Sequence, residues 1–251
     1  MITGILGSDD SVPRPRMDTV QRASVCGNGK TVTLAYIGWR EFSSTKDKGY
    51  RGYAGTDKEG EPRQIISNFH TCFPGGAPGQ QPSWSEYRTS QQIFDHWWDE
   101  QDRGALIMVT ELQALFNSCN RNNKIMAYIE RCLNQRRKFD HEFVYDSQEL
   151  GSLDLRFRKA TNFIYIPMKF HAAYVPQYKE YVPVDPCPLD NCNKAHIIQV
   201  YQNYPFPSSY EEMTTPKFKL KAWVVGKIYD TNEPMKDVLR YNPAWEHLGL
   251  E

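Results

Sequence analysis

The sequence predicts an α/β fold, in which a mostly parallel, doubly wound sheet carries helices on both faces and a β-rich extension follows. Candidate strands alternate with candidate helices through residues 17–168, the order that produces a parallel sheet. Residues 105–109 form a continuous apolar run, as in a central strand buried on both faces. A glycine-rich loop at residues 24–31 directly precedes an apolar, proline-free segment, which is typical of a loop leading into a helix.

This loop contains the distal half of a phosphate-binding pattern, G-x-x-x-x-G-K-[ST]. Ser24 stands where the first glycine is expected, and residues 17–23 are too polar for the buried strand that normally precedes such a loop. Glycines allow backbone N–H groups to approach a polyphosphate closely. Lys30 would then reach the β- and γ-phosphates of ATP, and Thr31 would hold Mg²⁺. The expected nucleotide-binding residues are Ser24, Gly27, Asn28, Gly29, Lys30 and Thr31. A plain Gly-Asn-Gly turn is the alternative.

The composition favours a packed globular protein. A chain of 251 residues suits one large domain or two small ones, and 40% hydrophobic residues allow a sizeable core. The formal net charge is zero, so a polyanionic partner would need a local basic patch. No apolar run approaches the roughly 20 residues that span a bilayer, and the N-terminus does not resemble a secretory signal. We therefore expect a soluble, cytoplasmic protein without a transmembrane segment.

The six cysteines are scattered along the chain, which favours free thiols over a disulfide framework. Cys187 and Cys192, with His196 nearby, have a spacing at the loose end of zinc-site patterns. No second Cys/His pair lies close in the sequence, so a loop with two thiols is the favoured interpretation.

The first part of the chain is expected to begin with an edge strand or arm. Residues 1–6 are apolar and residues 7–16 are rich in breakers. A helix is expected over residues 31–39, because the positive end of a helix must face the bound phosphates. Residues 64–69 form a compact strand candidate that ends at Ser67 and Asn68.

The middle of the chain is expected to contribute a helix over residues 90–98, with Ser90 as N-cap. Its two tryptophans, Trp97 and Trp98, are expected to pack rather than bind a ligand. The apolar run 105–109 follows and ends at Thr110 and Glu111.

An apolar strand that ends in an acidic residue is typical of a nucleotide-hydrolysis site. In such sites an Asp holds Mg²⁺ through water and the following Glu polarises the attacking water. Glu111 is therefore the expected catalytic residue, whereas Thr110 stands in place of the Asp. A surface glutamate capping the helix that starts near Leu112 is the alternative.

Next, apolar residues at spacings of three and four predict a helix over residues 124–137. Strands are expected over residues 142–146, which run into Ser147 and Gln148, and over 161–167. The carboxyl ends of parallel strands meet at one edge of a sheet, where ligands bind. The pairs expected to converge there, beside the loop, are Ser67–Asn68, Thr110–Glu111 and Ser147–Gln148.

A group of basic residues lies within residues 131–159 of this neutral chain. These residues either form a solvated surface, contact nucleic-acid phosphates, or include an arginine that acts on the ATP of a neighbouring subunit. The group comprises Arg131, Arg136, Arg137, Lys138, Arg156, Arg158 and Lys159.

The last third is rich in Tyr and Pro and is interpreted as β-hairpins that extend the sheet or form a small lobe. The chain is accordingly divided into an arm at residues 1–16, a nucleotide-binding core at 17–168 and a β-rich extension at 169–251, all within a single ATPase domain spanning residues 1–251.

The order of these motifs resembles that of a known family. Gly-Asn-Gly-Lys-Thr is followed by Ile-Ile-Ser-Asn, then by an apolar strand ending in Glu-Leu-Gln, and then by Asn-Gln-Arg-Arg-Lys and Tyr-Asp-Ser-Gln. Leu-Asp-Leu-Arg-Phe-Arg and Tyr-Asp-Thr-Asn-Glu come next. Across residues 20–235 the chain resembles the FtsK/HerA-type P-loop ATPases that package viral genomes, and it is also similar to the Zot-like assembly ATPases of filamentous phages.

The resemblance implies a P-loop core with an additional strand and a catalytic glutamate, assembled as a ring, usually a hexamer. It implies ATP-driven translocation of double-stranded DNA into a capsid, with capsid or vertex proteins as partners, in the host cytoplasm or at the packaging vertex of the virion. In these terms Glu111 is the catalytic glutamate, Gln148 the polar γ-phosphate sensor and Arg137 the finger that reaches a neighbour's ATP, with Arg156 or Arg158 as second choice.

Two residues depart from the family pattern. Ser24 replaces the first glycine of the loop, and Thr110 replaces the Walker B aspartate. A threonine hydroxyl can still contact Mg²⁺ through water, although without charge, so either hydrolysis is slow or an acid is supplied from elsewhere. The rival interpretations are a Zot-like extrusion ATPase and a virion structural protein that keeps the fold but turns over little ATP.

Overall fold

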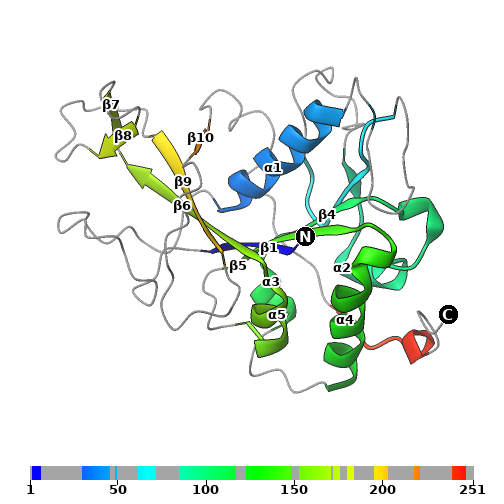
Figure 1. Cartoon of the computed structure of the whole chain (residues 1–251). Helices are drawn as coiled ribbons and strands as arrows, with labels where there is room; N and C mark the ends of the chain where they lie inside the picture. Colours follow the sequence, from blue (N-terminus) through cyan, green and yellow to red (C-terminus); the bar gives the residue numbers. More distant parts are fainter. Residues whose placement is uncertain are drawn as a thin grey trace.

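The computed structural model describes the main part of residues 17–168 and several C-terminal strands. The described residues are 2–6, 30–45, 49, 61–71, 85–116, 123–147, 153–170, 172–175, 180–183, 195–202, 218–220 and 239–246. Within them lies an eight-stranded sheet of order β10-β9-β6-β1-β5-β4-β2-β3 (Figure 1). Pairing is parallel from β6 to β3, whereas β9 and β10 are added antiparallel. The predicted mostly parallel sheet is thus confirmed.

The elements follow one another along the chain in the predicted alternation. The strands are β1 (Ile2–Leu6), β2 (Ile65–Ser67), β3 (Glu86–Tyr87), β4 (Leu106–Val109), β5 (Glu142–Ser147), β6 (Phe163–Phe170), β7 (Ala172–Val175), β8 (Glu180–Pro183), β9 (Ala195–Gln202) and β10 (Phe218–Leu220). The helices are α1 (Lys30–Thr45), α2 (Ser90–Asp95), α3 (Leu112–Leu115), α4 (Asn123–Gln135) and α5 (Leu155–Ala160), with 3-10 turns η1 (Glu100–Asp102), η2 (Arg136–Lys138) and η3 (Pro243–Glu246).

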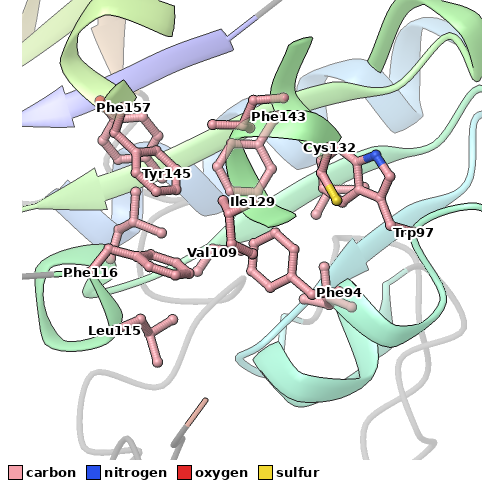
Figure 2. Close-up of a cluster of buried hydrophobic side chains, with 14 of the residues drawn as sticks. Phe94, Trp97, Val109, Leu115, Phe116, Ile129, Cys132, Phe143, Tyr145 and Phe157 are labelled. Atoms are coloured by element: carbon pink, nitrogen blue, oxygen red, sulfur yellow. The ribbon is translucent and has the colours of Figure 1, made fainter. Parts of the chain in front are cut away.

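Strand β4 separates two hydrophobic layers. Leu106 and Met108 belong to a cluster with Leu34 of α1. Ile107 and Val109 belong to a second cluster that includes residues of α2, α4 and α5, shown in part in Figure 2. Because successive side chains of a strand point to opposite faces, α1 covers one face of the sheet and the other helices cover the opposite face (Figure 1). The predicted central strand, buried on both faces, is confirmed.

The N-terminal residues correct one expectation. Residues 1–6 were expected to form an edge strand or arm, but β1 pairs with β5 on one side and β6 on the other. Its five residues are enough for a central strand because both neighbours complete its backbone hydrogen bonds. Strand β5 therefore lies between β1 and β4. The proposed boundaries of the arm, core and extension stay predictions.

Helix α2 begins as a capping box predicts. The expected N-cap was Ser90, but Thr89 caps the helix: its side chain accepts the N–H of Gln92, while the Gln92 side chain accepts the N–H of Thr89. The local sequence Thr-x-x-Gln fits this motif, and the missed signal was that reciprocal pair. Trp97 is 1% exposed and stacks on Phe94 with ring centroids 5.6 Å apart, so its predicted packing role is confirmed.

The C-terminal third contributes to both sheet and core. Strands β9 and β10 extend the main sheet, and β7 and β8 form a separate two-stranded sheet, as expected for hairpins. The sequence did not indicate that η3 would reach the core, where Trp245 is 0% exposed and stacks on Tyr128 of α4 at 4.3 Å.

Candidate functional site

The strand register brings two chemically important residues, Thr110 and Asp146, to one edge of the sheet. Val109 of β4 pairs with Tyr145 of β5, so the next residues, Thr110 and Asp146, are neighbours at the carboxyl ends. Both continue the alternation of Met108 and Val144, which face α1. On the other side of β5, Asp146 pairs with Ile5 of β1. Asp146 therefore occupies the centre of the sheet edge and faces the first turn of α1.

Asp146 is the centre of a hydrogen-bonded cluster. The Thr31 hydroxyl donates to Oδ2 at 2.8 Å, and the Thr110 hydroxyl lies 3.1 and 3.0 Å from Oδ1 and Oδ2. The backbone N–H of Glu111 donates to Oδ1 at 2.6 Å. Asp146 is 0% exposed. One carboxylate thus joins the start of α1, the end of β4 and the expected catalytic glutamate.

The environment of this carboxylate disfavours its charge. Burial is the main cause that raises the pKa of Asp146 to about 6, and the nearby charge of Glu111 acts in the same direction. Hydrogen bonds from Glu111 N–H and from the two threonine hydroxyls act in the opposite direction but do not cancel the effect of burial. Carboxylates with pKa values perturbed by burial are concentrated in functional sites.

Asp146 was missed as a site residue by the sequence reasoning, which assigned only the strand around it. The available signal was an acidic residue at the end of an otherwise apolar strand segment, Phe143-Val-Tyr-Asp. A carboxylate rarely occupies a fully buried position without specific partners. Its importance follows only from the position of β5 beside β4, which the sequence order does not state.

Glu111 adopts an unusual backbone conformation at the start of α3. Its φ of 53° and ψ of 44° place it in the left-handed region, which is uncommon for a residue with a β-carbon and is often retained at functional sites. This conformation directs its N–H at Asp146. Its half-buried side chain accepts a hydrogen bond from Gln113 Nε2.

Asn68, which follows β2, fixes the backbone before Glu111. The N–H of Thr110 donates to Asn68 Oδ1 at 2.8 Å, and Asn68 Nδ2 lies 3.4 Å from the Thr110 carbonyl oxygen. Nδ2 also donates to Ser90 Oγ at 3.2 Å. The expected convergence of Asn68, Thr110 and Glu111 is confirmed.

Replacing Asn68 is expected to loosen this edge. In Asn68→Ala the buried N–H of Thr110 loses its acceptor, which costs about 1–3 kcal/mol of unfolding free energy. Urea unfolding followed by circular dichroism measures this change. Ser44→Ala removes an exposed hydroxyl bonded to Glu41 and serves as the control. Equal stability of the Asn68 and Ser44 variants would show that the amide does not hold Thr110.

The start of α1 agrees with a phosphate-binding role. Lys30 and Thr31 are the first two residues of a 16-residue helix, whose N-terminal end favours anions. The Thr31 and Thr110 hydroxyl oxygens are 3.5 Å apart. The other predicted loop residues, Ser24, Gly27, Asn28 and Gly29, lie outside the described residues, as does Gln148.

Arg137 lies at the other edge of the sheet. It is exposed in η2, ahead of the amino end of β5, whereas Asp146 lies near the carboxyl end of that strand, roughly 15 Å further along. The structure therefore does not bring Arg137 together with Glu111 within one chain. A role at a neighbour's site stays a prediction.

Three other basic residues have partners within the chain. Arg136 is buried and donates to the Leu133 carbonyl oxygen at 2.7 Å. Arg156 pairs with Asp154 at 2.9 Å, and Arg131 donates to the Trp245 carbonyl oxygen. The side chain of Arg158 lies outside the described residues, whereas Lys138 and Lys159 are exposed. These contacts favour structural roles for Arg131, Arg136 and Arg156.

The structure tests the expectation of free thiols at one cysteine, and it also bears on the expected absence of a transmembrane segment. Cys132 is a buried free thiol, and burial raises its pKa. Cys187 and Cys192 lie outside the described residues. Among the residues that the structure describes, no helix combines the length and apolar character needed to cross a membrane.

Comparison with known proteins identifies structural relatives. No protein-family model and no curated protein matches the chain. The solved structure of the N-terminal domain of zonular occludens toxin from Neisseria meningitidis is similar, with 14% identity and a TM-score of 0.50 over 91% of this chain and 98% of that one. The genome packaging NTPase B204 from Sulfolobus turreted icosahedral virus 2, in complex with ATP-gammaS, has 12% identity and a TM-score of 0.43 over 80% of this chain and 91% of that one. The likeness to the zonular occludens toxin domain extends over nearly the whole of both chains and confirms the P-loop NTPase fold.

Proposed function

We propose that the chain is an ATPase that drives double-stranded DNA into a viral procapsid. The observation that carries the ATPase part is the convergence of Thr31, Glu111 and Asp146 at the carboxyl edge of a P-loop fold. The order of the motifs, which resembles that of genome-packaging ATPases, supports DNA as the cargo. The same proposal includes assembly into a ring, expected to be a hexamer, and contacts with capsid vertex proteins.

Each site residue has a distinct task in this proposal. Lys30 binds the β- and γ-phosphates, and Glu111 polarises the attacking water. Gln148 reports the γ-phosphate, and Arg137 of one subunit stabilises the charge that develops on a neighbour's ATP. Mg²⁺ would neutralise phosphate charge when bound, and the oxygen ligands available near Thr31 suit it. Catalysis is thus positioning combined with charge stabilisation.

The proposed DNA contacts are independent of base sequence. A motor must move along any sequence, so phosphates are the appropriate ligands. Since the net charge is zero, those contacts must come from a local group of basic side chains, of which Lys138 and Lys159 are exposed. The motor would act in the host cytoplasm or at the packaging vertex of the virion.

Two other functions each have an observation in their favour. The likeness to the zonular occludens toxin domain favours a phage assembly or extrusion ATPase, which would use the same ATP site. Thr110 in the Walker B position favours a virion structural protein with little turnover. The buried Asp146 carboxylate beside Thr31 argues against that loss of chemistry.

An ATPase assay with and without double-stranded DNA tests the proposal. We expect Mg²⁺-dependent hydrolysis that DNA stimulates, and we expect Lys30→Ala to lower it at least tenfold, by about 1.4 kcal/mol or more of transition-state stabilisation. Lys124→Ala, which removes an exposed lysine of α4, is the matched control. A hydrolysis rate that double-stranded DNA does not change would favour the assembly ATPase, and no hydrolysis would favour the structural protein.

A further inference from the structure

We propose that Asp146 provides the anionic protein group of the Mg²⁺ site, in place of the Walker B aspartate that is absent at Thr110. The carboxylate stands near the end of β5, while a threonine follows the neighbouring strand β4 at the Walker B position. This inference rests on the proposed ATPase function and assigns a metal-site residue to it.

The first argument is the position of the carboxylate. Asp146 and Thr110 lie side by side on the α1 face, one residue beyond the last β4–β5 pair, Val109 with Tyr145. The two side chains are close enough for the Thr110 hydroxyl to approach both carboxylate oxygens, at 3.1 and 3.0 Å. A carboxylate on either strand therefore reaches the same region in front of α1.

The second argument is the contact with the P-loop threonine. The Thr31 hydroxyl donates its hydrogen to Asp146 Oδ2 at 2.8 Å. A hydroxyl that donates to a carboxylate keeps its oxygen lone pairs available for a cation. Asp146 thus orients Thr31 as a metal ligand, and it adds the negative charge that Thr110 lacks. Such partners of a metal ligand strongly affect metal affinity.

The third argument is the fit of the donor set to the ion. Mg²⁺ prefers hard oxygen ligands, and in nucleotide sites one or two protein groups suffice because phosphates provide the others. Thr31 and Asp146 supply a hydroxyl and a carboxylate in contact with one another. Among the described residues no group of three or more His, Cys, Asp or Glu side chains could hold a metal ion by itself, so the phosphates of the nucleotide would have to supply the remaining ligands.

The same carboxylate also connects the metal region with the catalytic glutamate. Asp146 Oδ1 accepts the N–H of Glu111 at 2.6 Å, and the left-handed conformation of Glu111 makes this contact. A carboxylate on β5 therefore contacts both the proposed Mg²⁺ ligand Thr31 and the residue that polarises water. Thr110 also takes part in this arrangement, because its hydroxyl contacts both oxygens of Asp146.

Binding of a non-hydrolysable ATP analogue, measured by calorimetry on the full chain in Mg²⁺ and in EDTA, tests the assignment. Wild-type protein is expected to bind more tightly in Mg²⁺. For Asp146→Asn, the ratio of analogue affinity in Mg²⁺ to analogue affinity in EDTA is expected to fall at least tenfold. The affinity of this variant in EDTA is expected to stay within about twofold of wild type. Electron paramagnetic resonance of Mn²⁺ with the analogue is expected to show the same loss of bound ion.

The double variant T110D/D146T returns the carboxylate to β4 and is expected to recover most of the Mg²⁺ dependence. It also carries the test if Asp146→Asn does not fold, because it keeps one carboxylate at the edge. Asp102→Asn is the matched control: Asp102 is another buried aspartate, paired with Arg88 at 2.9 Å beside the amino end of β4, and its Mg²⁺ dependence should equal that of wild type.

The outcomes separate this inference from the proposed function. A folded Asp146→Asn protein with the Mg²⁺ dependence of wild type overturns the role of Asp146, whereas the ATPase proposal stands. A folded T110D/D146T protein without Mg²⁺-dependent tightening also overturns it. Wild-type protein that binds no analogue under either condition overturns the ATPase proposal itself.

Discussion

We expect Glu111→Gln to lower the turnover number for ATP by about 10²–10⁴-fold, the usual contribution of a positioned general base. The amide keeps the size of the side chain but cannot accept a proton from the attacking water. Since the backbone N–H of Glu111 makes the contact with Asp146, the substitution leaves that hydrogen bond in place. Single-turnover hydrolysis, measured beside analogue affinity, is the appropriate experiment, and we expect affinity to change by less than about threefold.

The control for Glu111→Gln is Glu100→Gln, an exposed glutamate paired with Arg103 at 2.8 Å beside the amino end of β4. Its turnover should equal that of wild type. A Glu111→Gln enzyme that turns over at the wild-type rate would remove Glu111 from the chemistry and leave it as the N-cap residue of α3. Reduced affinity with unchanged turnover would point to a binding role instead.

The sequence predicted the parts of the fold in which local pattern and tertiary environment agree. Residues 105–109 are apolar without interruption, and β4 is correspondingly buried on both faces. The proline-free segment after Gly29 became α1. Asn68, Thr110 and Glu111 were expected at one edge because they follow parallel strands. The hydrogen bonds between Asn68 and Thr110 and between Glu111 and Asp146 confirm this.

The sequence did not predict features that depend on the spatial order of the strands. A five-residue apolar segment followed by a breaker-rich stretch is compatible with an edge or a centre, so β1 was misplaced. The role of Asp146 depends on β5 lying between β1 and β4, because only that order brings its carboxylate to Thr31. The Walker B pattern looks for an aspartate at the end of one particular strand, whereas the proposed metal site requires only that some carboxylate lies near Thr31.

We expect Asp146→Asn to become more stable than wild type as the pH rises, when both proteins are nucleotide-free and kept in EDTA. The quantity that grows is the unfolding free energy of the variant minus that of wild type. Burial raises the pKa of Asp146 from 3.8 to about 6 in the folded state. A raised folded-state pKa means that the contribution of the group to stability is complete below about pH 4 and is lost as the pH rises through about 6. Above that pH, the wild-type protein must keep a disfavoured charge in its interior.

The asparagine side chain suits the same surroundings. Its carbonyl oxygen can accept the N–H of Glu111, and its NH₂ group can donate to the hydroxyls of Thr31 and Thr110, which serve as donors or acceptors. We therefore expect the difference in unfolding free energy between variant and wild type to grow by up to about 3 kcal/mol from pH 4 to pH 7.5. Urea unfolding at several pH values measures this difference directly.

A difference that stays constant with pH would show that the carboxylate is not destabilising in the empty protein. Asp102→Asn gives the comparison, since it leaves the Arg88 guanidinium without its buried partner and should destabilise the protein at pH 7.5. The expected contrast between two buried aspartates has a physical cause. Asp102 faces a guanidinium, whereas Asp146 accepts hydrogen bonds from two hydroxyls and an N–H. The proposed Mg²⁺ site would account for a destabilising carboxylate at this sheet edge, because a cation bound there with nucleotide would restore the stability that the nucleotide-free protein lacks.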